Sequence, residues 1–307
     1  MKYIVTGGAG FIGSHLAEFL SLQGHEVCII DNLSSGKIDN IAHLIETNDV
    51  TFVKGSVTDL DLLQEQCTGA DGLFHQAALV SVPKSIDDPL LNHTVNSTGT
   101  LNVLLAARDA GVRKVVFASS AAVYGNLPGL PKREDMAVDP QSPYAVAKLT
   151  GEYYCVLFSR LYGLKTVSLR YFNVYGPRQD PHSDYAAVIP RFIYRVKRGQ
   201  PPVIYGDGDQ TRDFIYVTDV VRMNLRAIES KAEGVLNVAS GKETSVNELA
   251  HTILSLKKTS LKPIYEKGRE GEVKHSVADI GKAIEHFGIT PEYDLSRGLS
   301  DMVSGMI

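Results

Sequence analysis

Three glycines near the N-terminus constrain the fold of this chain more than any other feature. An apolar segment, residues 3–6, runs into glycines at positions 7, 10 and 13, and residues 14–22 then have helical character. At such a strand-to-helix turn Gly7 permits the tight turn, Gly10 lets the backbone approach a pyrophosphate, and Gly13 lets the helix pack against the strand. The pattern predicts a dinucleotide-binding unit whose helix N-terminus faces the phosphates.

The acidic residue Asp31 indicates which dinucleotide this turn binds. A second apolar segment, residues 26–30, ends in Asp31, near the spacing of about 20 residues at which an acid binds a ribose diol. A carboxylate there would repel a 2′-phosphate, and residues 32–35 contain no arginine that could bind one. The sequence therefore predicts NAD rather than NADP.

Strands and helices continue to alternate beyond this unit. Apolar segments at 50–53 and 72–75 flank a helical segment at 59–66, and a long helix is expected over 89–110. This alternation predicts an α/β fold with a doubly wound parallel (Rossmann) sheet, which binds its ligand at the carboxyl ends of the strands.

The turns at those carboxyl ends supply further cofactor candidates. Small residues after 72–75 would let the backbone approach the cofactor, and the turn after 50–53 would line an adenine pocket. His75 has no partner at metal-ligand spacing, so we interpret it as a structural residue and predict no metal site. Beyond the three glycines and Asp31, the cofactor-binding candidates are Phe11, Ile12, Asn32, Ser35, Gly36, Ser56, Val57, Gln76, Ala77, Ala78, Lys148 and Tyr171.

Regular alternation is lost in the second half of the chain. We therefore expect residues 1–170 to form the NAD-binding domain. Residues 171–307 should form mainly a smaller, interleaved substrate lobe, with some segments returning to the large sheet.

Composition excludes several classes of function. The chain has 307 residues, a net charge of −4 and no basic field that would attract nucleic acid. No apolar segment approaches the roughly 18 residues that a membrane span needs, and the N-terminal apolar segment is too short for a signal peptide. Three scattered cysteines fit reduced thiols. We expect a cytoplasmic protein.

A candidate catalytic group lies between residues 119 and 148. Tyr144 and Lys148 are four residues apart, so on a helix they share one face. A nearby positive charge favours phenolate, so Lys148 is expected to bring Tyr144 towards the working range of a general base. An apolar segment ending in Ser119 and Ser120 precedes this pair, and Ser120 could hydrogen-bond the same substrate oxygen. A Tyr-x-x-x-Lys pattern alone is common in helices. Here a dinucleotide-binding turn occurs in the same chain, and this combination favours a catalytic role for the pair.

With these residues placed, the chain resembles the extended short-chain dehydrogenase/reductase family, and within it the nucleotide-sugar 4-epimerases. The likeness covers essentially all of the chain. It rests on Gly7 to Gly13, Asp31, His75 to Ala78, Ser119-Ser120, the Tyr144/Lys148 pair, Arg170 to Arg178 and Gln210 to Phe214.

The resemblance implies a mechanism with tightly held NAD. Tyr144 would remove the proton from the sugar 4-hydroxyl while hydride leaves carbon 4, which gives a 4-keto intermediate. The keto sugar would turn over in the site, and hydride and proton would return to the other face. Lys148 would bind the nicotinamide ribose and lower the pKa of Tyr144.

The resemblance also implies a UDP-sugar substrate and the residues that bind it. Asn173, Arg212 and Arg269 would hold the diphosphate, and Val188 and Tyr205 would enclose uracil. Gln179 is a candidate for the sugar, and Lys84 is either a phosphate or substrate contact or a solvated charge. With Ser120, Tyr144 and Ser276, these residues complete the predicted substrate site.

Four positions refine the prediction within the family. Ala121 and Ala122 stand where dehydrating and decarboxylating relatives carry acidic residues, so neither reaction is supported. Ser56 stands where many relatives have an acid that contacts adenine. Ser276 occupies a position that resembles a gate, where a tyrosine crowds the sugar 2-substituent and a small residue leaves room for an acetamido group. We expect UDP-GlcNAc/UDP-GalNAc interconversion, with UDP-glucose/UDP-galactose as well.

Alternatives remain open at this point. A UDP-glucuronate 4-epimerase would need a cation or a cluster of hydroxyl groups near the sugar carboxylate, and Arg178 could serve as the cation. A net nucleotide-sugar oxidoreductase would release its dinucleotide in every cycle. A non-catalytic NAD-binding scaffold is least favoured, because the Tyr144/Lys148 pair is kept. By resemblance we also expect a homodimer, formed through the helices at 89–110 and 142–162.

Overall fold

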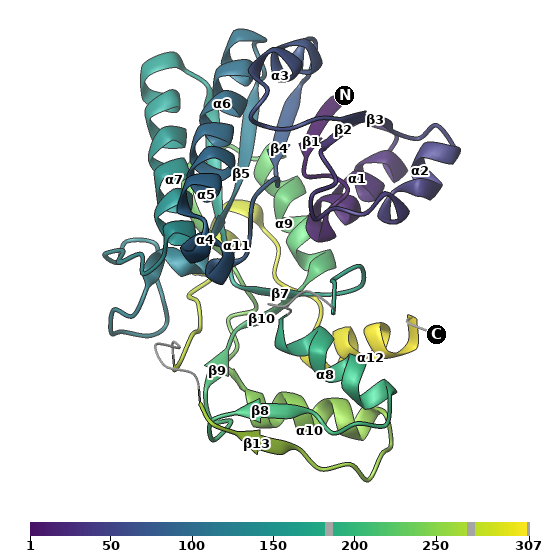
Figure 1. The fold of residues 1–307 in the computed structure, drawn as a ribbon. Helices are drawn as coiled ribbons and strands as arrows, with labels where there is room; N and C mark the ends of the chain where they lie inside the picture. The colour runs from purple at the N-terminus through teal and green to yellow at the C-terminus, as the bar shows by residue number, and fades with distance from the viewer. Residues whose placement is uncertain (182–186, 269–273, 306–307) are drawn as a thin grey trace.

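The computed structural model describes residues 1–181, 187–268 and 274–305, and a parallel β-sheet forms its centre (Figure 1). Among the described residues, seven parallel strands lie in the order β11-β6-β5-β4-β1-β2-β3. Their bounds are Lys2–Thr6 (β1), Glu26–Asp31 (β2), Thr51–Lys54 (β3), Gly72–His75 (β4), Lys114–Ser120 (β5), Lys165–Tyr171 (β6) and Gly234–Val238 (β11). The predicted doubly wound sheet is confirmed. The strand order reverses between β1 and β4, which is where such sheets bind their ligands.

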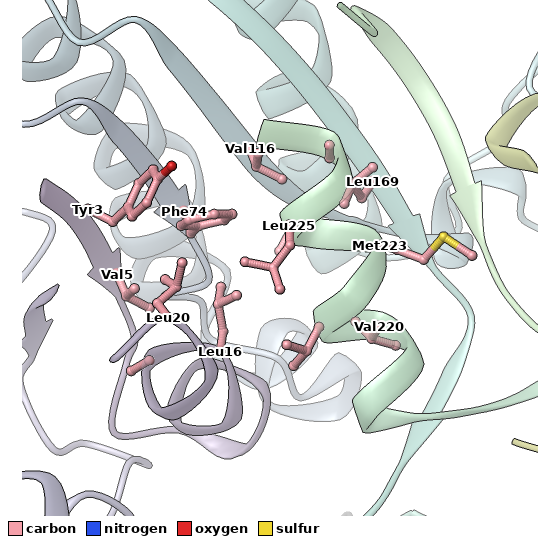
Figure 2. Close-up of a cluster of buried hydrophobic side chains, with 14 of the residues drawn as sticks. Tyr3, Val5, Leu16, Leu20, Phe74, Val116, Leu169, Val220, Met223 and Leu225 are labelled. Atoms are coloured by element: carbon pink, nitrogen blue, oxygen red, sulfur yellow. The ribbon is translucent and has the colours of Figure 1, made fainter. Parts of the chain in front are cut away.

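Helices cover both faces of this sheet. Alternate residues of β1 point to opposite faces, so Val5 joins one core and Ile4 the other. In the first core, Leu16 of α1 and Leu225 of α9 pack in one cluster with Phe74 of β4 (Figure 2). The first face carries α1 (Phe11–Leu22), α9 (Val217–Glu229) and α11 (Gly281–Phe287), and the second carries α3 (Leu60–Cys67), α6 (Gly99–Asp109) and α7 (Pro143–Tyr162).

The long helix predicted over 89–110 is interrupted, which the sequence pattern did not indicate. It consists of α5 (Pro89–Asn92), a π-helical segment (His93–Thr98) and α6. Within the π-helical segment, Asn96 accepts a hydrogen bond from the Leu79 amide (2.8 Å) and donates one to the Leu79 carbonyl (2.9 Å). The widened turn thus lets Asn96 hold the loop that follows β4. A single π-helical turn shifts the spacing of apolar residues along the helix too little to be recognised in the sequence.

A second, smaller group of elements forms the lower part of the molecule in Figure 1. Phe192, Leu249 and Met302 belong to its separate hydrophobic core. The chain order is not simple, because β11, α9 and α11 come from after residue 170 and pack in or on the large sheet. The smaller group contains α8 (Val188–Lys197), α10 (Val246–Leu256), α12 (Leu295–Gly305) and the strand pair β8 (Val203–Tyr205) and β13 (Ile264–Glu266).

The remaining short strands lie near the boundary between the two groups. β7 (Asn173–Tyr175) and β10 (Phe214–Tyr216) pair in parallel, and β9 (Thr211–Arg212) pairs with β12 (Thr244–Ser245). Across the described parts of the chain, no helix has both the length and the apolar character needed to cross a membrane.

A row of buried polar side chains crosses three neighbouring strands of the large sheet. The register places Ser119 of β5 opposite Arg170 of β6, and Arg170 opposite Asn237 of β11. Glu152 of α7 covers this row, because it accepts two hydrogen bonds from Arg170 (2.8 and 2.7 Å) and one from the Ser119 hydroxyl (2.5 Å). Arg170 also lies 4.6 Å from the ring centre of Tyr124, whose hydroxyl donates to Asn237 (2.7 Å).

This row fixes α7 to the sheet electrostatically as well as by packing. Burial alone would lower the pKa of Arg170, but the hydrogen bonds and the charge of Glu152 raise it, so the guanidinium stays charged. The pair is bidentate and both side chains are almost fully buried. Removing one partner therefore leaves an uncompensated charge inside the protein.

We predict that Glu152→Gln lowers the free energy of unfolding by about 3–5 kcal/mol, because Arg170 then remains buried without a counter-ion. Denaturant unfolding of the purified protein measures this loss. The matched control is Glu229→Gln, which removes a partner of Arg226 in an ion pair that is half exposed on both sides, and should cost less than about 1 kcal/mol. Equal, small losses in both variants would contradict the role given to the buried row.

Candidate active site

The glycine turn has a shape that only glycine permits and leaves room for phosphate. Gly7 has a φ of +71°, and a Cβ there would lie 2.6 Å from the Ala77 amide nitrogen. A Cβ on Gly13 would lie 2.2 Å from the Gly7 carbonyl oxygen. Helix α1 starts directly after Gly10, which offers no side-chain cap, so the first amide groups of the helix are available to a pyrophosphate. The turn therefore fits a dinucleotide.

Asp31 lies beside this turn at the carboxyl end of β2. Its carboxylate is buried and accepts hydrogen bonds from the amides of Ala9 (3.0 Å) and Leu33 (2.8 Å). Gly36 lies against it, since a Cβ there would be 2.9 Å from both carboxylate oxygens. The carboxylate thus faces the glycine turn, as contact with a ribose diol requires.

The other cofactor candidates differ in how well they are placed. Asn32 and Ser35 are exposed near Asp31, and Ser56 is half-buried with its hydroxyl 2.8 Å from that of Thr58. The side chain of Val57 packs in the second core, so only its backbone could contact a ligand. Phe11, Ile12, Ala77 and Ala78 are half-buried around the glycine turn and the loop after β4.

Two predicted residues of this region bond to each other and to a residue that the sequence did not single out. Gln76 donates to the Tyr171 hydroxyl (3.0 Å), which in turn donates to Asn224 of α9 (2.8 Å). Burial raises the pKa of Tyr171, so it stays a neutral hydrogen-bonding group. His75 is also structural: its ring nitrogens lie 2.8 and 3.0 Å from the hydroxyls of Thr6 and Thr100, and burial lowers its pKa to about 3.

The candidate catalytic residues meet where β5 ends and α7 begins. Ser142 caps α7 by accepting from the Ala145 amide (3.2 Å), so Tyr144 lies in the first helical turn. The Tyr144 phenol adjoins Ser120, the last residue of β5, and the Ser120 hydroxyl acts to lower the pKa of the phenol. One turn further, the Lys148 ammonium donates to the Ala118 carbonyl (2.7 Å) and lies 5.8 Å from the Tyr144 ring centre. The geometry brings together the three residues predicted to be catalytic.

The expected acidification of Tyr144 by Lys148 is not what the protein groups alone produce. Burial raises the pKa of Tyr144, and the Ser120 hydrogen bond only opposes this rise. Burial also lowers the pKa of Lys148 to about 7, so its charge is weakened at neutral pH. Sequence spacing gave the proximity of the two groups correctly, but it carried no information on how deeply they are buried.

A cavity of about 810 Å³ opens beside this group, between the large sheet and the smaller group of elements. Its volume lies in the range of small-molecule sites. Ser142 belongs to its wall, two residues before the almost fully buried Tyr144. Seven predicted residues line it: Ser120, Tyr171, Asn173, Val188, Tyr205, Arg212 and Ser276.

Four other predictions for the substrate site have different outcomes. Lys84 is exposed on α4 (Val82–Asp87) and does not line the cavity. Val82, Pro83 and Ile86 of the same helix do line it, although they are also exposed. Gln179 is also not part of the wall. Arg178 bonds to Glu18 of α1 (2.5 Å), so it does not serve as a sugar-site cation. Arg269 lies outside the described residues.

The structure adds residues to the cavity that the sequence analysis missed. Arg191 and Arg195 of α8 line it, and the Arg191 guanidinium lies 5.8 Å from the ring centre of Tyr205. Lys132 and Asn126, from the loop after β5, also line the cavity. Surface and cavity charges look alike in a sequence, so no signal distinguished these residues.

Comparisons with known proteins agree with this geometry. Residues 3–239 match the model of the NAD dependent epimerase/dehydratase family. The chain is 44% identical to a putative UDP-glucose 4-epimerase of Methanocaldococcus jannaschii, over 99% of this chain and 97% of the relative.

Two solved structures are similar over nearly their whole length. One is the UDP-N-acetylglucosamine 4-epimerase from Methanobrevibacter ruminantium in complex with UDP-N-acetylmuramic acid, with a TM-score of 0.95, 42% identity and coverage of 99% and 97%. The other is the UDP-glucose 4-epimerase of Thermus thermophilus in complex with NAD, with a TM-score of 0.90, 36% identity and full coverage of both chains. With its glycine turn, Asp31 and the Ser120–Tyr144–Lys148 group, this chain belongs to the NAD-dependent epimerase/dehydratase family.

Proposed function

We propose that this protein is an NAD-dependent UDP-sugar 4-epimerase, which inverts carbon 4 through a transient 4-keto sugar. One observation carries the proposal: the Tyr144 phenol adjoins both Ser120 and Lys148, and Ser120 lines a cavity large enough for a nucleotide sugar. The relatives named above are UDP-glucose and UDP-N-acetylglucosamine 4-epimerases, which supports the same chemistry.

Each protein group has a defined task in this proposal. The glycine turn, the N-terminus of α1 and Asp31 hold the dinucleotide. When bound, NAD supplies the hydride acceptor at carbon 4 and, in its oxidised form, a positive charge that favours the Tyr144 phenolate. Tyr144 takes the proton from the 4-hydroxyl and later returns it. Ser120 orients that oxygen, and Lys148 stays fixed to the Ala118 carbonyl, one helical turn from Tyr144.

Two structural features weigh against the alternatives. Ala121 and Ala122 line the cavity, and among the described residues of its wall no acidic side chain is present that could eliminate water, which disfavours dehydration. The buried Ser120, Tyr144 and Lys148 group is complete, which disfavours a non-catalytic scaffold. A net oxidoreductase is distinguished from an epimerase by experiment, because only an epimerase needs to retain its dinucleotide through the cycle.

The sugar preference follows from Ser276. This small residue lines the same cavity as Ser120, which supports a sugar pocket wide enough for a 2-acetamido group. We propose UDP-GlcNAc and UDP-GalNAc as substrates, together with UDP-glucose and UDP-galactose. Arg191, Arg195 and Arg212 line the part of the cavity formed by the smaller group of elements, where they can bind the diphosphate.

A homodimer is also proposed, through the exposed side of α7. Along this helix Val146, Tyr153, Leu157 and Leu161 are 50%, 59%, 45% and 67% exposed, at helical spacings of seven, four and four residues. The α5 residue Leu90 is 75% exposed. A helix face of this kind can pair with its own copy about a two-fold axis. A cytoplasmic location stays a prediction from the sequence.

We predict that Tyr144→Phe lowers turnover of UDP-GlcNAc by about 100- to 10,000-fold, because the general base is removed. Bound NAD should remain, as measured by its absorbance after gel filtration. Tyr153→Phe removes a hydroxyl from an exposed tyrosine of the same helix and should leave turnover unchanged. Near-normal turnover in Tyr144→Phe would exclude this residue as the base, and loss of NAD from the wild-type protein in each cycle would favour a net oxidoreductase.

Substitution of Ser276 by tyrosine should separate the two substrate pairs. The larger side chain would crowd an acetamido group, so we predict a loss of about 10- to 100-fold in kcat/KM for UDP-GlcNAc and a much smaller change for UDP-glucose. Ser255→Tyr, on the exposed side of α10, controls for a general effect of a surface tyrosine. An equal loss of kcat/KM for UDP-GlcNAc and UDP-glucose would contradict the role of Ser276 as a gate for the sugar 2-substituent.

Leu157→Glu should convert the dimer into monomers, because a carboxylate would be buried in the apolar interface. Sedimentation velocity measures the change. Leu22→Glu, at a leucine that is 79% exposed at the end of α1, is the matched control and should leave the dimer intact. A wild-type protein that sediments as a monomer would contradict the proposed interface.

A further inference from the structure

Lys132 is a buried cation that the proposed reaction does not use. It follows the turn after β5 and is only 6% exposed. It nevertheless lines the cavity, as do Ser120, Asn126 and Ser276. A lysine side chain is rarely buried to this degree without a partner for its charge.

The backbone holds Lys132 firmly beside the proposed gate. Its amide donates to the Val277 carbonyl (2.8 Å), and its carbonyl accepts from the Asp279 amide (2.9 Å) and from the Asn237 side chain (2.9 Å). Asn237 is the end of the buried row described above. Lys132 is therefore fixed next to the segment that carries Ser276, by contacts that do not involve its own ammonium group.

The ammonium group has little to bind within the protein. It donates to the Leu127 carbonyl, and burial lowers its pKa. Within the described parts of the chain, no carboxylate lies at ion-pair distance from it; Asp135 pairs with Arg133, and Glu134 accepts from the Asn237 amide. A buried ammonium without an anion is unfavourable, so an anionic ligand would stabilise it.

The other cations of the cavity have different positions. Arg191, Arg195 and Arg212 line it from the smaller group of elements, as does Tyr205, and their charges suit the diphosphate. Lys132 comes instead from the chain that follows the catalytic strand β5. A UDP-sugar with an uncharged hexose carries no negative charge beyond its diphosphate. Lys132 is thus one cation more than a neutral sugar requires.

We propose that Lys132 binds a carboxylate carried by the sugar, so that the substrates of this enzyme include carboxylate-bearing UDP-N-acetylhexosamines. The inference rests on the proposed 4-epimerase function. The chemistry at carbon 4 is unchanged, with Tyr144 as the base. Lys132 takes the place that Arg178 cannot fill, because Arg178 is paired with Glu18.

The test compares three nucleotides on the holoenzyme. UDP-GlcNAc has no carboxylate, UDP-N-acetylglucosaminuronate carries one at carbon 6, and UDP-N-acetylmuramic acid carries one on its lactyl ether. Dissociation constants are measured for the wild type, for Lys132→Met and for Lys274→Met, a matched substitution of an exposed lysine two residues before Ser276. Turnover of UDP-GlcNAc and thermal stability are measured on the same preparations.

We expect Lys132→Met to raise the dissociation constant of at least one of the two acidic nucleotides by about 10- to 100-fold, because a charged hydrogen bond is lost. The dissociation constant of UDP-GlcNAc should change by less than about threefold in Lys132→Met. Lys274→Met should leave the dissociation constants of all three nucleotides unchanged. The acid that responds identifies the position of the carboxylate. Failure of the wild type to bind either acid, an equal loss for all three nucleotides, or no loss at all would overturn the proposal. Absence of UDP-GlcNAc turnover in the wild type would instead refute the 4-epimerase function.

Discussion

Hydrogen bonds between strand β5 and helix α7 determine the position of the candidate catalytic groups. The Lys148 ammonium donates to the Ala118 carbonyl at 2.7 Å, and one turn earlier the Tyr144 phenol adjoins Ser120. One turn beyond Lys148, Glu152 binds Ser119 and Arg170. Three successive turns of one helix are thus tied to the carboxyl end of the sheet. The catalytic groups are consequently part of the core, and their geometry does not depend on a surface loop.

Burial of the same groups determines their protonation. A phenol and an ammonium placed together in water would favour phenolate. Inside the protein, desolvation raises the pKa of Tyr144 and lowers that of Lys148 to about 7. Both shifts favour the uncharged forms. In the proposed mechanism the positive charge of a bound oxidised cofactor would oppose these shifts and favour the Tyr144 phenolate.

Parts of this site could be predicted because their roles depend on local chain geometry. Gly7 and Gly13 are required by a turn formed within a few residues of the chain. The position of Asp31 is set by β2, the strand that it ends. Asn224 and Lys132 could not be predicted, because their positions depend on how distant segments pack. The sign of the shift in the pKa of Tyr144 was also inaccessible, since a sequence spacing shows which groups are close and not how much water surrounds them.

The division of the cavity between two groups of elements explains how one fold can serve several sugars. The large sheet supplies the chemistry, and the smaller group of elements supplies cations and aromatic rings for a nucleotide. Ser276 and Lys132 come from segments that meet at a short bridge in the cavity wall, so in the proposed function substitutions there would change the sugar without moving Tyr144. Selectivity and catalysis would then depend on different residues.

The fate of the hydrogen on carbon 4 tests the central claim most directly. UDP-GlcNAc carrying deuterium at carbon 4 is incubated with the holoenzyme in ordinary water, and the epimerised product is analysed by mass spectrometry and NMR. The account predicts that deuterium is retained at carbon 4 with inverted configuration, because the hydride leaves and returns within one site. Replacement of the label by solvent hydrogen, or its release on free dinucleotide, would contradict the account.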